Sequence, residues 1–421
     1  MAAKERKKIL LRLADLITRN EEELALLETL DMGMPIRDSV LVDVPLSAEC
    51  LAWYGEAIDK LYDEVAPTGP DAVTLIRKAP LGVVGAVTPW NYPLMIACWK
   101  IGPILATGNT MVLKPAEQSP LTALKLATLA AEAGLPEGVL NVVPGFGHTA
   151  GQALGRHMDV NALTFTGSTA IGKKFLCYSG ESNMKKVSLE CGGKTPNIVL
   201  NDVPDIDKAA KAIAMGVFFN QGEVCNAGSR VIVEESLRED LLSRVKAESE
   251  KFQPGDPLDP DTIMGALVDK NHTNRVLDYI RIGQDEGAHV VTGGRRARPQ
   301  SNGCFVEPTI LDRVTPAMRV AQEEIFGPVL SVISVGGFDE AIKVANGTIY
   351  GLGAGVWTSD IVKAHRAAER LRAGVIWING HDLGDISSPV GGFGQSGFGR
   401  DKSLHSMDKY QDYKTMWINL S

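Results

Sequence analysis

The sequence has 421 residues, of which 44% are hydrophobic and 22% charged, as in an ordinary globular protein long enough for two or three domains. Its formal net charge of -8 argues against non-specific nucleic-acid binding, which needs clustered positive charge. The most apolar stretch, 93–105, contains Lys100 and Pro103 and is too short to span a bilayer. We therefore expect neither nucleic acid nor a membrane as a partner.

The six cysteines are scattered along the chain without CxxC spacing, so the sequence suggests neither a disulfide framework nor a metal site. Reduced thiols are usual in the cytosol, and the N-terminus lacks the apolar core of a secretion signal. A cytoplasmic location without a bound metal is therefore the expectation.

The N-terminal part of the chain has a helical pattern. Apolar residues on one face predict a single helix over 4–30 that is stopped by Gly33, and a second helix around 48–61. The turn-forming residues within 65–78 favour a protruding β-hairpin.

From residue 81 onward, short apolar strands alternate with helices. Strands are predicted over 81–87, 110–114, 139–143, 162–166 and 186–190, with helices between them over 93–106, 121–133, 150–157 and 170–178. Buried strands joined by helices imply a parallel sheet that binds ligands at the carboxyl ends of its strands. A second α/β series follows over 196–379, and a β-prone C-terminal strand over 413–420 needs a partner. The predicted fold class is α/β, with doubly wound parallel sheets.

One cysteine is distinguished by its surroundings. Cys225 lies between Gly222 and Gly228, just before a strand predicted over 230–234. Glycines allow a substrate and backbone N–H donors to approach the sulfur closely, which favours a catalytic nucleophile. For an isolated cysteine a buried structural role is commoner, so this interpretation depends on the other motifs.

Two polar residues at strand ends could complete such a site. Asn91 follows the first strand, and its amide could bind a developing oxyanion together with the Cys225 N–H, or could simply cap the next helix. Glu190 ends the last strand of the first series before Gly192 and Gly193. Partial burial there would raise its pKa toward that of a general base, although a salt-bridged structural carboxylate is the alternative.

Further motifs at the same sheet edge suit a dinucleotide. The turn over 165–172 opens a helix, and its small residues would let a phosphate reach the helix N-terminus. Lys114 and Glu117 follow another strand, where a carboxylate can accept both ribose hydroxyls and would repel a 2′-phosphate, favouring NAD over NADP. Glu324 and Phe326 offer a second such carboxylate and an aromatic ring for the nicotinamide. Taken singly, these motifs are also explained as ordinary turns or exposed charges.

In this order and spacing the motifs resemble the NAD(P)-dependent aldehyde dehydrogenase superfamily, over nearly the whole chain. The resemblance implies that Cys225 attacks an aldehyde, that Asn91 and the Cys225 N–H hold the oxyanion, and that Glu190 activates the water that hydrolyses the thioester. It also implies cofactor contacts at Thr88, Trp90, Lys114, Glu117, Gly147, Phe165, Gly167, Ser168, Glu324 and Phe326.

The same resemblance implies three parts of the molecule. Residues 1–64 and 79–193 would form the NAD-binding domain and 194–395 the catalytic domain, while 65–78 and 396–421 would form an oligomerisation arm. The expected assembly is a homodimer or homotetramer, because an unpaired C-terminal strand makes a monomer unfavourable.

Within the superfamily the sequence most resembles the γ-glutamyl-γ-aminobutyraldehyde and guanidinobutyraldehyde dehydrogenases of polyamine catabolism. The runs 181–186 and 399–405 carry this closer similarity. We expect Asp385 to attract a distal amino or guanidino group of the aldehyde substrate, with Tyr92 and Trp99 as apolar walls.

Three positions depart from the family pattern. Val390 stands where a Phe is usual, which would widen the substrate tunnel. Cys191 replaces a Leu beside Glu190, and Glu223 replaces a frequent Gln close to Cys225. These departures bear on the identity of the substrate rather than on the chemistry.

Two other functions stay open. A coenzyme A-acylating relative would pass the thioester to coenzyme A, but that branch generally lacks a base such as Glu190. A non-catalytic relative is conceivable because the sequence begins later than those of family members, yet Cys225, Glu190 and Asn91 are all present.

Overall fold

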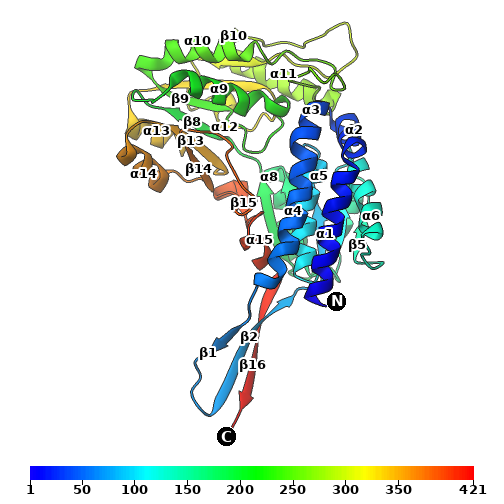
Figure 1. Ribbon diagram of the computed structural model, residues 1–421. Coiled ribbons are helices and arrows are strands. Elements are labelled where there is room, and N and C mark those ends of the chain that lie inside the picture. Colours follow the sequence, from blue (N-terminus) through cyan, green and yellow to red (C-terminus); the bar gives the residue numbers. More distant parts are fainter.

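The computed structural model describes all 421 residues, which are organised by three β-sheets. A six-stranded and a seven-stranded sheet form the body of the molecule, and helices cover both of them. A three-stranded sheet extends from the body as a narrow arm, with the C-terminus at its tip (Figure 1). None of the helices combines the length and the apolar character that crossing a membrane requires.

Two helices, rather than one, occupy the N-terminal region. α1 (Ala3–Arg19) ends and α2 (Glu21–Met32) begins at Asn20, whose side-chain amide donates to the carbonyl of Leu16 at 2.8 Å. The prediction of a single continuous helix was wrong at this point because the apolar spacing continues across the break, whereas an Asn side chain competes for backbone hydrogen bonds. Gly33 ends α2 in the left-handed conformation, with φ of +88°.

The chain then returns along α1. It forms α3 (Ile36–Asp38), a π-helical turn η1 (Ser39–Asp43), α4 (Val44–Ala57) and a short 3-10 turn η2 (Ile58–Lys60). α4 packs between α1 and α5 and buries Leu51 and Tyr54 in the largest hydrophobic cluster of the molecule. These helices thus support one face of the first sheet.

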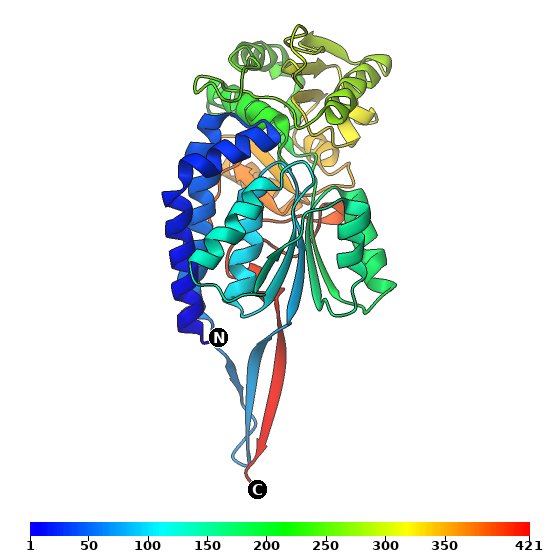
Figure 2. The ribbon, with the colours of Figure 1, turned by 90° about the vertical axis from the view of Figure 1, so that its right-hand side faces the viewer.

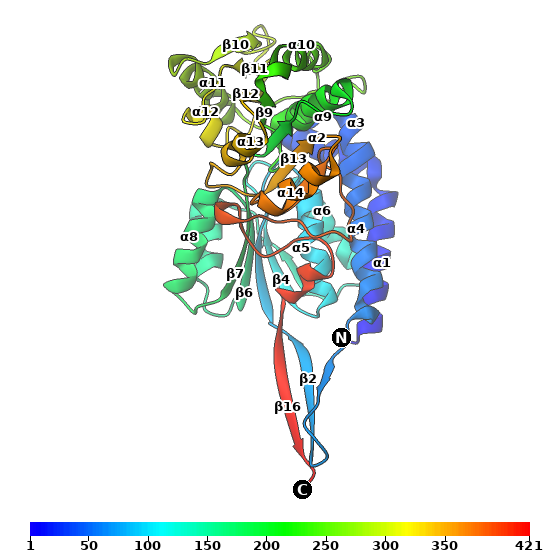
Figure 3. The same ribbon diagram turned by 90° about the vertical axis from the view of Figure 1, so that its left-hand side faces the viewer.

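The six-stranded sheet has the strand order β15-β7-β6-β3-β4-β5 and is parallel except for β15. Its strands are β3 (Val83–Val87), β4 (Thr110–Lys114), β5 (Leu140–Val142), β6 (Ala162–Gly167), β7 (Lys186–Cys191) and β15 (Gly397–Phe398). Its helices are α5 (Pro93–Ala106), α6 (Leu121–Glu132), η3 (Gly147–Gly151), α7 (Gln152–Arg156) and α8 (Thr169–Gly180). α8 lies on one face, and α5, α6, α4 and α1 lie on the other (Figure 3). The five strands predicted before residue 191 are confirmed.

The seven-stranded sheet has the order β10-β11-β12-β9-β8-β13-β14 and is parallel except for β10. Its strands are β8 (Pro196–Val199), β9 (Arg230–Glu234), β10 (His289–Thr292), β11 (Thr309–Asp312), β12 (Val329–Val335), β13 (Gly353–Trp357) and β14 (Val375–Ile378). Its helices are α9 (Ile206–Phe218), η4 (Phe219–Gly222), η5 (Glu235–Leu237), α10 (Arg238–Ser249), α11 (Lys270–Asp285), α12 (Arg319–Gln322), α13 (Phe338–Ala345) and α14 (Ile361–Arg370).

The arm consists of β1 (Glu64–Ala66), β2 (Ala72–Pro80) and β16 (Gln411–Asn419), in the order β1-β2-β16. β16 pairs antiparallel with the full length of β2, so the C-terminal strand finds its partner in the predicted hairpin (Figure 2). The segment before β16 contains η6 (Gly394–Ser396), β15 and α15 (His405–Asp408). β15 pairs with β7 in the six-stranded sheet, so the C-terminal part of the arm begins later than residue 396.

Candidate active site

A cavity of about 660 Å³ lies between the carboxyl edge of the six-stranded sheet and the part of the molecule built on the seven-stranded sheet. Its wall combines the loop after β3, the ends of β6 and β7, the loop before β9, the start of α11 and part of the segment 382–402. This volume is typical of small-molecule sites. Cys225, Glu190 and Asn91, predicted from three distant motifs, all line this cavity.

A tight turn with left-handed backbone precedes Cys225 and sets the direction of its loop. Asn220 and Gln221 have φ of 45° and 56°, and Gly222 follows with φ of +73°. A Cβ at Gly222 would lie 2.4 Å from the backbone of Gly327, so only glycine fits there. Left-handed Asn and Gln cost about 1 kcal/mol each, and strain of this kind persists where the surroundings hold it.

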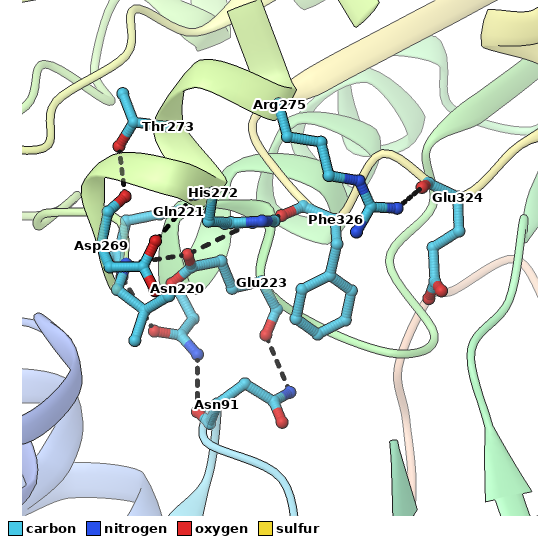
Figure 4. A network of polar contacts seen from close by, with 11 residues as sticks. Asn91, Asn220, Gln221, Glu223, Asp269, His272, Thr273, Arg275, Glu324 and Phe326 are labelled. Carbon is cyan, nitrogen blue, oxygen red and sulfur yellow. Dashed lines mark hydrogen bonds and ion pairs between the residues drawn. The ribbon is translucent and has the colours of Figure 1, made fainter. Parts of the chain in front are cut away.

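Hydrogen bonds tie Asn91 to the same loop. Its Nδ2 donates to the carbonyl of Glu223 at 2.8 Å, and Asn220 Nδ2 donates to the carbonyl of Asn91 at 3.1 Å (Figure 4). The loop after β3 and the loop before β9 are thereby held together. One Asn91 amide hydrogen is engaged by Glu223, which leaves the second for a ligand in the cavity.

Glu190 and Cys225 face each other across the cavity wall. Neither carboxylate oxygen of Glu190 accepts from an N–H or O–H group, although the residue is only 5% exposed, and the Cys225 thiol is its neighbour. Burial, with the nearby charge of Asp401, raises the pKa of Glu190 to about 7. Burial, together with the charge of Glu190, also raises the pKa of the Cys225 thiol well above its usual value. A carboxylate free to bind a proton therefore lies beside a thiol that needs to lose one.

Gly193 allows the loop that carries Cys225 to lie close to the end of β7. A Cβ there would lie 2.8 Å from the Cys225 carbonyl oxygen. The paired glycines after β7 thus let the loop of the second sheet reach the strand end of the first sheet.

Five of the predicted cofactor residues line the cavity: Trp90, Gly167, Ser168, Glu324 and Phe326. Ser168 caps α8, and its Oγ accepts from the N–H of Ile171 at 3.4 Å. A Cβ at Gly167 would lie 2.6 Å from the buried Phe165 ring, so a larger residue there would displace that ring. This open helix end suits an anionic group such as a phosphate.

The other five predicted cofactor residues lie outside this cavity. Lys114 is buried, donates to the Pro115 carbonyl at 2.7 Å and pairs with Glu117 at 3.1 Å. The hydroxyl of Thr88 is buried without a hydrogen-bond partner, and Gly147 opens η3 beside Glu117. These four residues belong to the carboxyl edge formed by β3, β4 and the connection after β5, whereas Phe165 is the fifth.

Phe165 differs from the rest of that set. Its ring packs in a hydrophobic cluster with Phe175 and Leu189, so only its backbone reaches the sheet edge. A buried ring on β6 contributes packing, and the dinucleotide-contact prediction for its side chain has no support in this geometry.

Glu324 and Phe326 reach the cavity from the loop after α12. Glu324 Oε1 accepts from the N–H of Gly193 at 3.1 Å, and burial raises the pKa of this carboxyl to about 7. The ring of Phe326 packs edge-on against Trp90, with the ring centroids 5.2 Å apart. An unpaired carboxylate oxygen, an aromatic wall and an open helix N-terminus match the hydroxyl, ring and phosphate groups of a dinucleotide.

Two residues of this region were not singled out by the sequence motifs. His272, on the first turn of α11, has its Nε2 2.6 Å from the Phe326 carbonyl and 3.6 Å from Glu223 Oε1 (Figure 4). Burial lowers the pKa of His272 to about 4, so the ring is neutral and Nε2–H donates to Phe326. Arg275 donates to the Glu324 carbonyl at 3.0 Å. Both residues lie on α11, and a position in a helix does not by itself predict a contact with the cavity.

Glu223 is fully buried next to this pair. Its Oε1 accepts from the Val268 N–H at 3.1 Å, whereas Oε2 has no partner. Burial raises the pKa of Glu223 well above its usual value. Burial therefore favours the protonated form of this carboxyl more than solvent would.

Tyr92, Trp99 and Val390, which were predicted to contact the substrate, also line the cavity. Asp385 does not line the cavity, because its carboxylate accepts instead from the backbone and hydroxyl of Ser387 at the exposed surface. Two charged residues of the segment 382–402, Asp382 and Lys402, do line the cavity.

Cys191 lies near the cavity but does not enter it. Its side chain is buried in the cluster beneath α8, where a Cβ at Gly172 would lie 2.9 Å from its sulfur. Burial raises the pKa of this thiol to about 12, which keeps it protonated and unreactive.

Comparison with known proteins agrees with this geometry. Residues 1–416 match the aldehyde dehydrogenase family. The chain is 51% identical over 415 residues to the NADP/NAD-dependent aldehyde dehydrogenase PuuC of Escherichia coli, covering 99% of this chain and 83% of that protein. Two solved structures superpose on all of this chain and 85% of theirs: an indole-3-acetaldehyde dehydrogenase in complex with NAD+ (57% identity, TM-score 0.99) and the γ-glutamyl-γ-aminobutyraldehyde dehydrogenase of Burkholderia cenocepacia (50%, 0.98). The chain belongs to the aldehyde dehydrogenase family.

Proposed function

We propose that this protein oxidises an aldehyde to a carboxylate with NAD+, and that Cys225 is its nucleophile. The observation that carries the proposal is the buried carboxylate of Glu190 beside the Cys225 thiol in a cavity that also contains Asn91. A nucleophile, a base and an oxyanion donor are the groups that acyl chemistry on an aldehyde requires.

The chemistry follows from these three groups. Glu190 accepts the thiol proton, and the Cys225 sulfur forms a bond to the carbonyl carbon, which turns the carbonyl oxygen into an oxyanion. Asn91 Nδ2 and the Cys225 backbone N–H stabilise that oxyanion. Glu190 then releases the thiol proton to solvent. After the substrate carbon is oxidised to a thioester, the regenerated Glu190 carboxylate removes a proton from water. Attack by this water breaks the carbon–sulfur bond and releases the carboxylate.

NAD+, when bound, supplies the acceptor for the hydride that leaves the substrate carbon. Glu324 and Glu117 would accept ribose hydroxyls, the α8 N-terminus at Ser168 would receive a phosphate, and Phe326 would pack against the nicotinamide. The NAD+ complex of the indole-3-acetaldehyde dehydrogenase supports this choice, and PuuC is by its name NADP/NAD-dependent. The carboxylate of Glu117 favours NAD over NADP.

An amino- or guanidino-aldehyde of polyamine catabolism is the proposed substrate class. The relative from Burkholderia cenocepacia acts, by its name, on γ-glutamyl-γ-aminobutyraldehyde. Tyr92 and Trp99 would flank the substrate chain, and Val390 would leave room for its distal group. We further expect a homo-oligomer in the cytoplasm, where the six free cysteines would stay reduced.

Transfer of the acyl group to coenzyme A is the second candidate reaction. A buried carboxylate with no hydrogen-bond partner favours water as the acceptor, because such a group can remove a proton from a water molecule.

The test measures the absorbance of the NADH that the protein forms from each aldehyde of a panel. The panel contains 4-aminobutanal, its γ-glutamyl and guanidino forms, betaine aldehyde and aliphatic aldehydes, with products analysed with and without coenzyme A. We expect NADH and a free carboxylic acid, and no NADH from Cys225→Ala. Full activity in Cys225→Ser would refute the mechanism, and an acyl-coenzyme A product would favour the second reaction. NAD binding without NADH from any aldehyde would indicate a non-catalytic relative.

A further inference from the structure

The ammonium group of Lys402 lies over the Trp99 ring in the cavity but has no anionic partner of its own. Lys402 lines the cavity, and its Nζ lies 5.7 Å from the centre of the Trp99 ring. The ammonium makes no ion pair or hydrogen bond with the protein, and burial lowers the pKa of Lys402. A half-buried cation of this kind is poorly solvated, so an anionic ligand group would stabilise it.

The backbone holds Lys402 in this position at a conformational cost. Lys402 and Ser403 both have positive φ, of 60° and 51°. An isolated β-bridge between Val390 and Asp401 precedes them, and the Ser403 N–H donates to the Ile386 carbonyl at 2.8 Å. Left-handed residues with a Cβ cost about 1 kcal/mol or more each. The surrounding contacts therefore fix the direction of the lysine rather than leaving it free on the surface.

Three carboxylates influence Lys402, and they are not equivalent. Glu49 on α4 and Asp385 are exposed and do not line the cavity. Asp382 lines the cavity, and its Oδ1 accepts from Asn226 Nδ2 at 2.6 Å. Asp382 and Lys402 form no ion pair, so one negative and one positive group are presented separately to a ligand at this end of the cavity.

We propose that Lys402 binds a carboxylate, and Asp382 the neighbouring ammonium, of a zwitterionic α-amino-acid group at the distal end of the aldehyde substrate. Lys402 is thus a specificity-determining residue. This proposal rests on the proposed aldehyde oxidation and refines its substrate class.

The same charges disfavour a purely cationic substrate. The ammonium of a free amino-aldehyde could pair with Asp382, but it would leave Lys402 without a counter-charge and would lie near a like charge. Tyr92, Met95 and Trp99 also line the cavity, and their apolar surfaces suit an uncharged linker. An amino-aldehyde acylated by the side-chain carboxyl of an amino acid has both properties.

Four amides of 4-aminobutanal separate the two charges. The γ-glutamyl amide carries both the carboxylate and the ammonium, the glutaryl amide only the carboxylate, the 4-aminobutanoyl amide only the ammonium, and the butanoyl amide neither. NADH formation gives kcat/KM for each amide, and the ratio to the butanoyl amide is the measure of recognition. We expect the γ-glutamyl amide to have the highest ratio and the glutaryl amide to exceed the 4-aminobutanoyl amide.

Lys402→Met is expected to lower the ratio for the γ-glutamyl and glutaryl amides about 10- to 100-fold, the range for a lost hydrogen bond to a charged group. The loss should appear in KM rather than kcat, because the contact is equal in ground and transition states. Lys402→Arg should restore most of the ratio. Glu49→Gln, which removes a nearby charge outside the cavity, should leave the ratio within about threefold.

The outcomes separate this inference from the proposed function. If the unaltered protein forms no NADH from any of the four amides or from butanal, the proposed function fails. If it oxidises the amides but Lys402→Met and Lys402→Gln leave the γ-glutamyl and glutaryl ratios unchanged, the inference is overturned. Equal loss for all four amides would also overturn it, because it would indicate a structural role for Lys402.

Discussion

At the scale of single residues, the pKa of Glu190 sets the pH dependence of the reaction. Burial raises this pKa to about 7, and a general base works only when it has lost its proton. We therefore expect kcat/KM to be high above pH 7 and to fall about tenfold per pH unit below it. A pH profile from 5.5 to 9 measures this. Glu190→Gln should lose about 10²–10⁴ in rate together with this acidic limb, and a flat profile in the unaltered protein would contradict the assignment.

Glu223 gives a second residue-scale prediction, concerning stability. The pKa of its carboxyl is raised above 4.5 in the folded state, so the folded state binds this proton more tightly than the unfolded chain. Its contribution is therefore present below the unfolded pKa and is lost as the pH rises through the folded pKa. Glutamine cannot ionise, so Glu223→Gln should raise Tm at pH 8 more than at pH 5. A Tm difference independent of pH would contradict this explanation.

The residues of the candidate site were predictable to different degrees. Cys225, Glu190 and Asn91 flank strand ends, and parallel strands bring such ends together, so their meeting follows from the strand pattern. The strand pattern did not show that Lys402, rather than Asp385, lines the cavity. This difference depends on left-handed backbone at Asp382 and Lys402, and neither residue is a glycine that would mark the turn.

At the scale of elements, a buried ion pair joins α5 to the segment before β16. Lys100 on α5 and Lys409 both pair with Asp401, and Lys100 and Asp401 are each 1% exposed. Burial opposes ionisation of Asp401, but these lysines hold its pKa at about 2. Its stabilising contribution is therefore present above the unfolded pKa of 3.8 and is lost as the pH falls through about 2.

Removing Asp401 should be costly because Lys100 would stay buried without a counter-charge. We expect Asp401→Ala to lower the free energy of unfolding by about 3–5 kcal/mol, measured by denaturant unfolding at pH 7. Asp412→Asn is the matched control, since the exposed pair of Asp412 with Lys186 contributes about 0–1 kcal/mol. Similar effects for the two variants would show that the buried pair adds no more than the surface pair.

Element boundaries were predictable where turn chemistry is local. Gly33 ends α2 as expected, because only glycine adopts its left-handed conformation without cost. The break at Asn20 was missed because the hydrophobic face continues from α1 into α2 and both helices bury it in the same cluster. The short strand β15 could not be predicted, because two residues carry no periodicity and their pairing with β7 is a long-range contact.

At the scale of the whole molecule, the arm is the part that projects from the body with exposed apolar side chains. The hairpin was predictable from its turn-forming residues and the C-terminal strand from its β-prone run, and β16 does pair with β2. The sequence could not show that no helix covers this sheet. Tyr413 and Trp417 on one face of β16, and Met416 and Ile418 on the other, are exposed.

A three-stranded sheet with apolar residues on both faces and a free edge along β16 is expected to dock on a second copy of this chain. Light scattering coupled to size exclusion should give the mass of a dimer or tetramer. Tyr413→Glu combined with Trp417→Glu should reduce that mass at least twofold, since buried like charges at a self-complementary contact repel. The Asp412→Asn control on the same strand should keep the parent mass. A monomeric parent protein, or a double variant with unchanged mass, would place the assembly contact elsewhere.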